Sequence, residues 1–319
     1  MKNILVTGGA GYIGSNIINE LIKKKFKVIS VDNLSTGFRK LIHPKSIFYK
    51  VDILDLKKIR SIIIKHKIDS IIHLAAKLSV EESEKKPKTY FKCNVIGTNK
   101  LVKACLNTKV KNFLFSSTCA VYGNKTVKVK ENSKKNINSI YGKTKFLAEK
   151  NLKKNFKGNL AILRYFNVVG ASDDNKFGQI NKNGQLFKNL SIQVLKKKPK
   201  IFIYGKNYNT KDGTCIRDYI HVTDIARIHL KILKKISKFS SSAVLNCGYG
   251  KPYSVLDIVK QFEKVSKKKI QIIFKPKRKG DVEKIFADNQ KIKNFINYNF
   301  TFNNLKKIIK TCIKWENKI

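Results

Sequence analysis

The stretch Val6-Thr7-Gly8-Gly9-Ala10-Gly11-Tyr12-Ile13-Gly14 decides the fold of this 319-residue chain. It joins an apolar run at 3–7 to an amphipathic pattern at 13–24. Its glycines allow a tight turn, let the backbone approach a pyrophosphate, and let the helix pack closely on the strand. The helix N-terminus adds a partial positive charge. The stretch predicts a dinucleotide site, with a purely structural turn as the alternative, and its expected contacts are Gly8, Gly11, Tyr12, Ile13 and Gly14.

Outward from this turn, short β-branched runs alternate with lysine-faced amphipathic segments. Strands are expected at 3–7, 27–31, 46–50, 69–74, 111–116 and 160–164, and helices near 13–24, 55–66, 88–107 and 140–156. This alternation predicts an α/β fold, a doubly wound parallel Rossmann sheet with ligands at the carboxyl ends of the strands. We expect a nucleotide-binding domain at 1–166, with part of 213–247 returning to it, and a smaller C-terminal α/β substrate domain at 167–319.

Beyond Asn167 the pattern loosens. The polar segment 171–185 predicts a long loop. Helices are expected near 223–236, 254–266 and 303–315, and a strand is expected at 243–247.

An acidic residue ends the second predicted strand. Asp32 follows Gly14 by 18 residues, where a carboxylate accepts hydrogen bonds from an adenine ribose diol and disfavours a 2′-phosphate. The sequence therefore predicts NAD rather than NADP. Asp52 ends the third strand. Its carboxylate would accept a hydrogen bond from the adenine amino group, or it would serve only to cap a turn or a helix. His73 is followed by Leu74, Ala75 and Ala76, which suit a backbone packed against a cofactor and suit core packing equally well.

A tyrosine and a lysine four residues apart begin the helix predicted at 140–156. One turn places Tyr141 and Lys145 on the same face, where the ammonium would lower the phenol's pKa from about 10 towards that of a general base. Ser116 and Thr118 end the fifth strand nearby, and the Thr118 hydroxyl would share a hydrogen bond with a substrate oxygen or cap a helix. Tyr141, Lys145 and Thr118 are the expected catalytic residues of a hydride-transfer enzyme.

Composition narrows the other classes of function. The formal net charge of +47 comes from lysines spread over almost every segment rather than from a basic stripe, so we expect no nucleic-acid partner. Six cysteines without CxxC spacing predict reduced thiols and no metal site. No apolar run approaches the roughly 18 residues that a membrane span needs. We expect a cytoplasmic protein with no membrane partner.

Eight motifs resemble those of the extended short-chain dehydrogenase/reductases, and within them the chain is similar to the UDP-glucose 4-epimerases from end to end. The motifs are TGGAGYIG (7–14), VDN (31–33), HLAA (73–76), FSST (115–118), YGKTK (141–145), LRYFN (163–167), DGTCIRDYIHVTDIA (212–226) and RKGD (278–281). The resemblance implies reversible C4 epimerisation of UDP-glucose and UDP-galactose with tightly bound NAD. It also implies a homodimer formed through the helices predicted at 88–107 and 140–156.

The resemblance further assigns residues to the two ligands. NAD contacts would include Asn33, Ile53, Asn94 and Tyr165, besides the residues named above. The UDP-sugar would be held by Asn167, Gln185, Leu186, Tyr204, Arg217, Arg278 and Asp281, together with Thr118 and Tyr141. The two arginines suit phosphate oxygens without the analogy, because a guanidinium binds them in a bidentate fork, although surface ion pairing is the alternative.

Some positions depart from the family's pattern. Leu78 stands where some members carry a phosphate-contacting lysine, and Val168 replaces a common proline. Ile285 occupies a slot that bounds the sugar pocket and is smaller than a tyrosine, so we expect some turnover of UDP-GlcNAc.

Alternative functions stay open at this point. They are an epimerase of UDP-GlcNAc, UDP-pentose or UDP-uronate, a nucleotide-sugar 4,6-dehydratase, and a non-catalytic NAD-binding protein. The dehydratase would need an Asp-Glu pair where this chain has Cys119-Ala120.

Overall fold

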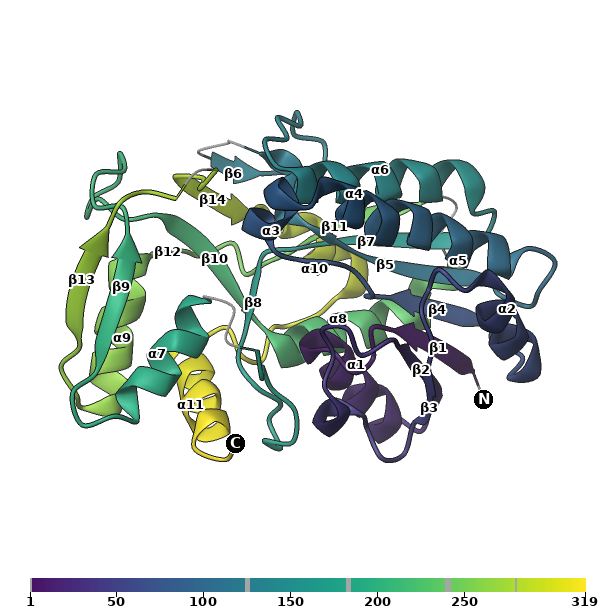
Figure 1. The fold of residues 1–319 in the computed structure, drawn as a ribbon, viewed down its shortest axis with the longest axis horizontal. Helices are drawn as coiled ribbons and strands as arrows, with labels where there is room; N and C mark the ends of the chain where they lie inside the picture. The colour runs from purple at the N-terminus through teal and green to yellow at the C-terminus, as the bar shows by residue number, and fades with distance from the viewer. Residues whose placement is uncertain (1, 124–126, 182–184, 239–241, 279) are drawn as a thin grey trace.

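A parallel sheet of seven strands forms the larger part of the molecule (Figure 1). The computed structural model describes residues 2–123, 127–181, 185–238, 242–278 and 280–319. In spatial order the strands are β11 (Ala243–Cys247), β7 (Asn159–Tyr165), β5 (Asn112–Thr118), β4 (Ser70–His73), β1 (Asn3–Thr7), β2 (Lys27–Asp32) and β3 (Ile47–Lys50). The order reverses at β1, whose neighbours are β2 and β4. The predicted doubly wound sheet is confirmed, and this reversal places a ligand crevice beyond the carboxyl ends of β1 and β4.

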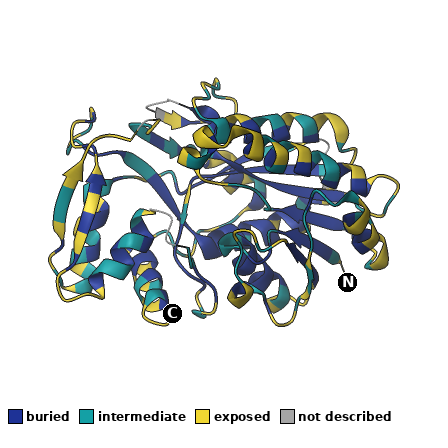
Figure 2. Cartoon of the chain, in the orientation of Figure 1, coloured by how far each residue is buried: buried dark blue, intermediate teal, exposed yellow. Residues whose placement is uncertain are grey.

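Helices cover both faces of this sheet. On one face α2 (Leu56–Lys65), α5 (Thr98–Cys105) and α6 (Ile140–Asn155) bury their apolar side chains against β1, β2, β4, β5 and β7. On the opposite face of the sheet, α1 (Tyr12–Lys23) and α8 (Val222–Lys235) bury their apolar side chains. The strands are buried almost throughout, whereas the outer faces of the helices are exposed (Figure 2). This explains the apolar runs of the strands and the lysine-faced helices.

The second half adds smaller sheets and a helical group. A five-stranded sheet contains β12 (Pro252–Ser254), β10 (Ile216–His221), β14 (Lys284–Ala287) and β6 (Val127–Val129), and β8 (Asn167–Val169) pairs with β10. A two-stranded sheet joins β9 (Lys200–Tyr204) to β13 (Gln271–Lys275). The helices are α7 (Leu186–Val194), α9 (Val255–Ser266), α10 (Gln290–Ile296) and α11 (Leu305–Glu316). Within the described residues, no helix is long and apolar enough to cross a membrane.

The strands and helices predicted for the first half agree with the structure to within about two residues. The helix expected at 88–107 is confirmed as helical backbone over 87–105, in which α4 (Pro87–Tyr90) continues into a π-helical segment, η2 (Phe91–Gly97), and then into α5; the sequence did not predict the π-helical segment. The structure also adds α3 (Val80–Lys85) before it. The polar segment expected as a loop at 171–185 has no helix or strand among its described residues, and 182–184 lie outside them.

Candidate active site

The glycine turn brings the start of α1 close to the ends of β1 and β4. Gly8 has a φ of +72°, and a Cβ there would lie 2.7 Å from the backbone nitrogen of Ala75. A Cβ on Gly14 would lie 2.2 Å from the Gly8 carbonyl oxygen. Gly11, the N-cap of α1, offers no side-chain cap to the first N–H groups of the helix. Side chains are thus excluded from this turn, and the helix N-terminus suits an anion such as a pyrophosphate.

Asp32 lies at the end of β2 beside this turn and is 9% exposed. Its carboxylate accepts hydrogen bonds from the N–H groups of Ala10 (3.1 Å) and Leu34 (2.8 Å), while burial raises its pKa above the usual value. Asp52 accepts from the Leu54 N–H at 2.8 Å and from the Asn33 amide at 2.7 Å. The sequence allowed Asp52 two possible roles, a contact to adenine or a turn carboxylate. In the structure its oxygens accept the hydrogen bond of a turn from Leu54 and another from Asn33.

The π-helical segment η2 places Asn94 against the loop that follows β4. The Asn94 side chain, 2% exposed, accepts from the Lys77 N–H at 2.8 Å and donates to the Lys77 carbonyl at 3.1 Å. Its other N–H donates to the Thr144 hydroxyl of α6 at 3.2 Å. Both N–H groups are therefore used within the protein. Asn94 fixes the loop that carries Leu74, Ala75 and Ala76, while Ile53 is buried against Gly97 of the same segment.

Tyr141 and Thr118 meet at the carboxyl end of β5. Thr118, the last residue of β5, accepts from the Ala120 N–H at 3.1 Å, which is the predicted capping role. The same hydroxyl lies close enough to the phenol of Tyr141, the second residue of α6, to act on the phenol's pKa. Tyr165 lies beside Thr118 in register on β7, and its hydroxyl is 2.8 Å from His229 Nε2. Ser116, on the same strand, is 8% exposed.

Lys145 lies one turn after Tyr141 and is 3% exposed. Its Nζ is 4.2 Å from the centre of the Phe115 ring. Among the described residues, Nζ has neither a hydrogen bond nor an ion pair. Burial lowers the pKa of this ammonium to about 8, with Cys93 and Glu149 acting in the opposite direction. A buried lysine without a protein partner is available to a ligand.

The expectation that Lys145 lowers the pKa of Tyr141 is wrong for this structure. Burial raises the pKa of the phenol to about 12, and the nearby Thr118 hydroxyl only partly offsets it. The helical spacing is as predicted, but burial of the phenol is the largest influence on its pKa.

Four of the residues expected to hold a UDP-sugar lie on β9, on β10 and in the segment after β13, namely Tyr204, Arg217, Arg278 and Asp281. The Arg278 guanidinium lies 3.8 Å above the ring of Tyr204, which is 38% exposed at the end of β9. Arg217 of β10 lies 3.9 Å from Asp281. Asn167 and Gln185 are exposed, whereas Leu186 packs against the main core. Arg217 thus has the surface ion pair considered as its alternative, although at 3.9 Å this pair is weak.

Sequence reasoning missed the part that Cys119 plays, because it treated this residue only as the absence of an acidic pair. The Cys119 thiol lies close enough to both Tyr141 and Arg217 to influence their charged forms or be influenced by them. It packs against a small apolar cluster that includes Ile285, which is 4% exposed. In the sequence, only the position of Cys119 directly after Thr118 could have indicated that it lies at the site.

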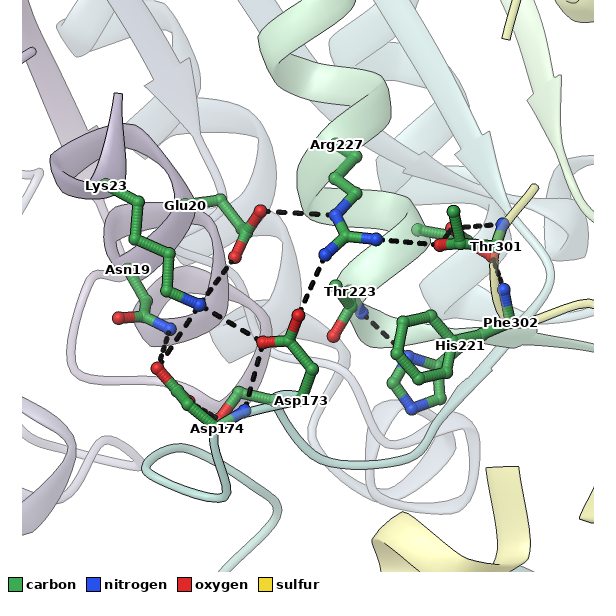
Figure 3. A network of polar contacts seen from close by, with 12 residues as sticks. Asn19, Glu20, Lys23, Asp173, Asp174, His221, Thr223, Arg227, Thr301 and Phe302 are labelled. Carbon is green, nitrogen blue, oxygen red and sulfur yellow. Dashed lines mark hydrogen bonds and ion pairs between the residues drawn. The ribbon is translucent and has the colours of Figure 1, made fainter. Parts of the chain in front are cut away.

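A polar network ties the loop after β8 to the helices beneath the glycine turn (Figure 3). Lys23 of α1 contacts Asp173 at 3.1 Å and Asp174 at 3.2 Å, and Arg227 of α8 contacts Asp173 at 2.8 Å. Tyr12 donates to the Gly170 carbonyl at 2.5 Å. The loop that follows Asn167 is thus fastened to the helix that begins at the glycine turn.

Comparisons with known proteins agree with this geometry. The model of the NAD dependent epimerase/dehydratase family matches residues 4–248. The UDP-glucose 4-epimerase of Lactobacillus helveticus is 37% identical over 317 residues, which cover 98% of this chain and 96% of that protein.

Solved structures are similar over the whole chain. The UDP-glucose-4-epimerase from Stenotrophomonas maltophila, with bound NAD and formylated UDP-arabinopyranose, has a TM-score of 0.94 and 31% identity, covering 100% of this chain and 98% of that one. The UDP-Glc/GlcNAc 4-epimerase from Campylobacter jejuni has a TM-score of 0.84 and 36% identity, covering 100% of both chains.

Proposed function

Because this chain belongs to the NAD-dependent epimerase/dehydratase family, we propose that it interconverts UDP-glucose and UDP-galactose by reversible inversion at C4 through a transient 4-keto sugar. The observation that carries this proposal is the meeting of Tyr141 and Thr118 beside a buried Lys145, which has no hydrogen bond or ion pair within the described part of the chain, at the carboxyl end of a Rossmann sheet. The reaction is an isomerisation, so the proton that Tyr141 removes from O4 returns to the same oxygen.

The residues around the glycine turn fit NAD. When bound, NAD supplies the hydride acceptor and donor at C4. The start of α1 from Gly11 to Gly14 would hold the pyrophosphate, and Asp32 with Asn33 would hold the adenine ribose. Lys145 would donate to the nicotinamide ribose, with Tyr165 beside the ring. The Ala10 and Leu34 N–H groups fix the Asp32 carboxylate in place for the ribose hydroxyls.

Tyr141 acts as the base and then as the acid. A phenol whose pKa is about 12 holds its proton at neutral pH, so it needs added positive charge nearby to work as a base. Lys145 would contribute that charge in its ammonium form, and a cationic nicotinamide would contribute more. The Thr118 hydroxyl, which lies beside the phenol, would share the substrate's O4 with it.

The UDP group would be held by the cluster on β9, β10 and the segment after β13. Arg217 and Arg278 would bind the diphosphate, Tyr204 would lie near the uracil, and Asp281 would hold Arg217. Asn167, Gln185 and Leu186 would complete the site. Binding energy from the nucleotide positions the reacting carbon while the sugar stays loosely held, which an inversion requires.

Each half of the chain would hold one of the two ligands. Residues 1–166, with part of 213–247, would hold NAD, and residues 167–319 would hold the UDP-sugar. The pairing of β11 with β7 supports that assignment. A homodimer through the helical faces of η2–α5 and α6, a place in galactose metabolism and a cytoplasmic location complete the proposal.

Ile285 supports a broader sugar range. It is smaller than the tyrosine that would narrow the pocket, so some UDP-GlcNAc turnover is expected beside UDP-galactose turnover. The similarity to a UDP-Glc/GlcNAc 4-epimerase supports the same range.

The first test is a product analysis. The purified protein, with no NAD added, is incubated with UDP-galactose, UDP-GlcNAc and UDP-xylose, and the products are identified by chromatography. We expect UDP-glucose from the first and a slower conversion of the second. Tyr141→Phe should lose about 100- to 10,000-fold in kcat while keeping its NAD. Near-full activity of that variant with NAD bound would contradict the role of Tyr141.

A further inference from the structure

Helix α6 carries a third ionisable residue in line with the two catalytic ones. Tyr141, Lys145 and Glu149 follow one another at four-residue intervals, which places them on one face of the helix. The Glu149 side chain is 2% exposed, so its charge is held inside the protein. A carboxylate one turn from a buried lysine is the usual geometry of a helical ion pair. No such pair joins Lys145 to Glu149 among the described residues.

The partner of Glu149 comes from a different element. Arg164 of β7, whose side chain is 3% exposed, donates from Nε to Glu149 Oε1 at 3.0 Å and from Nη2 to Oε2 at 2.7 Å. The Ser117 hydroxyl of β5 donates to Oε1 at 2.5 Å. Both carboxylate oxygens are thus engaged by β5 and β7. The bidentate fork and the buried setting make this the strongest class of charged hydrogen bond.

Arg164 is itself held from the opposite side. Its Nη1 donates to the Tyr122 hydroxyl at 3.0 Å and to the Glu131 carbonyl at 2.9 Å. Tyr122 in turn donates to Asn246 Oδ1 of β11 at 2.6 Å. The guanidinium therefore cannot shift towards α6 or away from it without breaking other hydrogen bonds, and it keeps Glu149 turned towards the sheet.

Lys145 faces few other charges. His73 of β4 is neutral, because burial lowers its pKa to about 3. Burial raises the pKa of the Cys93 thiol on η2 above its ordinary value, and that of the Tyr141 phenol to about 12, so neither carries charge at neutral pH. Phe115 of β5 contributes only its ring. Glu149 is therefore the formal negative charge that acts on Lys145.

We propose that Arg164 is a positioning residue that holds Glu149 away from Lys145 and so leaves the lysine ammonium available to a ligand hydroxyl. The inference rests on the proposed function insofar as that hydroxyl belongs to the nicotinamide ribose. Without Arg164, the buried carboxylate would keep the Ser117 hydroxyl but have no positively charged partner, a strongly unfavourable state. The Lys145 ammonium, one turn away, would relieve it, and the lysine would then be withdrawn from the cofactor.

The test measures the proton affinity of Lys145 in variants of known charge. The full-length chain, freed of nucleotide, is labelled with trace acetic anhydride between pH 6.5 and 10.5, and the labelling of Lys145 is followed by peptide mass spectrometry. Arg164→Gln should raise the pKa of Lys145 by at least one unit, so that its labelling at pH 7 falls about tenfold. Glu149→Gln leaves the Arg164 charge uncompensated and should lower that pKa. The double variant E149Q/R164Q, which removes both charges, should return it to the parent value.

The two single variants should shift the pKa of Lys145 in opposite directions, and this separates a positioning role of Arg164 from a merely structural one. Loosened packing would admit water in both variants and move both pKa values upward, and that result would overturn the proposal. An unchanged pKa in Arg164→Gln would overturn it too. If Arg164→Gln does not fold, Glu149→Gln and the double variant decide: equal values contradict the proposal, and a lower value in Glu149→Gln supports it. Because labelling needs no substrate, its outcome is independent of the product analysis above.

Discussion

At the scale of single residues, the stacking of Arg278 on Tyr204 links the two parts of the UDP cluster. The guanidinium lies 3.8 Å above the ring, and an exposed cation–π contact contributes about 0.5–1 kcal/mol. Tyr204→Leu should therefore raise KM for UDP-galactose about two- to fivefold with kcat unchanged, because the contact serves substrate and transition state equally. Tyr204→Phe keeps the ring and should match the parent. Steady-state kinetics on both variants measure this, and an equal rise in KM for the two would refute the stacking role.

The residue predictions came from motifs, which say little about burial. Tyr141 and Thr118 are brought together as expected, whereas the contact of Arg217 with Asp281 is the ion pair considered as the alternative for that arginine. The pKa of Tyr141 was not predictable, because burial comes from tertiary packing that helical spacing does not encode. For the same reason Glu149 was visible four residues after Lys145, but its pairing with Arg164 depends on the packing of β7 beside α6.

At the scale of elements, helix α3 completes the start of the catalytic helix. The Ser83 hydroxyl accepts from the backbone N–H of Tyr141 at 3.1 Å, and the Glu84 carboxylate accepts from that of Ile140 at 2.8 Å. Ser139, the N-cap, accepts from the Gly142 N–H at 3.1 Å. The first three N–H groups of α6 thus have partners, two of them from a separate helix. The position of Tyr141 therefore depends on α3 as well as on α6.

Removal of the Ser83 hydroxyl should affect activity as well as stability. Ser83→Ala leaves the Tyr141 N–H without a partner in a buried place, which should cost about 1–3 kcal/mol in the free energy of unfolding and lower kcat. Asn304→Ala is the matched control, since it removes an N-cap hydrogen bond from α11, away from the catalytic residues. It should cost about 1 kcal/mol and leave kcat unchanged. Urea unfolding and kinetics on both variants measure this, and an unaltered kcat in Ser83→Ala would count against the dependence on α3.

The elements of the first half were predictable, and many of the second half were not. Strands such as β5 are apolar throughout and are followed by amphipathic helices, so their pattern is local. Strands β8, β12 and β14 have three or four residues each, and all three, like β10, pair with strands distant in sequence, so no local pattern marks them. The π-helical turn at η2 was also unpredictable. It is held by Asn94 contacts to Lys77 and Thr144, which lie far from it in sequence.

At the scale of the whole molecule, three buried neutral histidines set the response to acid. Burial lowers the pKa values of His73 and His221 to about 3 and that of His229 to about 4. Because these folded-state values lie below that of the unfolded chain, stability is lost as pH falls below about 6.5. Asp218 opposes them between about pH 4 and 6, because burial raises its pKa to about 6. Unfolding near pH 5.5 should therefore take up about two protons in all.

This balance predicts a slope that can be measured. The free energy of unfolding should fall by about 2–3 kcal/mol per pH unit between pH 6.5 and 5, as measured by urea titrations at several pH values. His229→Gln keeps a hydrogen-bonding group for Tyr165 and should lower the slope by about 1.4 kcal/mol per pH unit. A slope that is flat, or identical in His229→Gln, would contradict the neutral state of these histidines.

The outermost strand of the large sheet has a consequence for how the chain is made. Strand β7 ends at Tyr165, but its neighbour β11 begins only at Ala243, so 77 residues separate the end of one from the start of the other. At about 5–20 residues per second, a ribosome needs about 4–15 seconds to produce that interval. During this time the edge of β7 has no strand to pair with. An unpaired strand edge is a template for wrong pairing, so the edge of β7 is open to such pairing until β11 emerges.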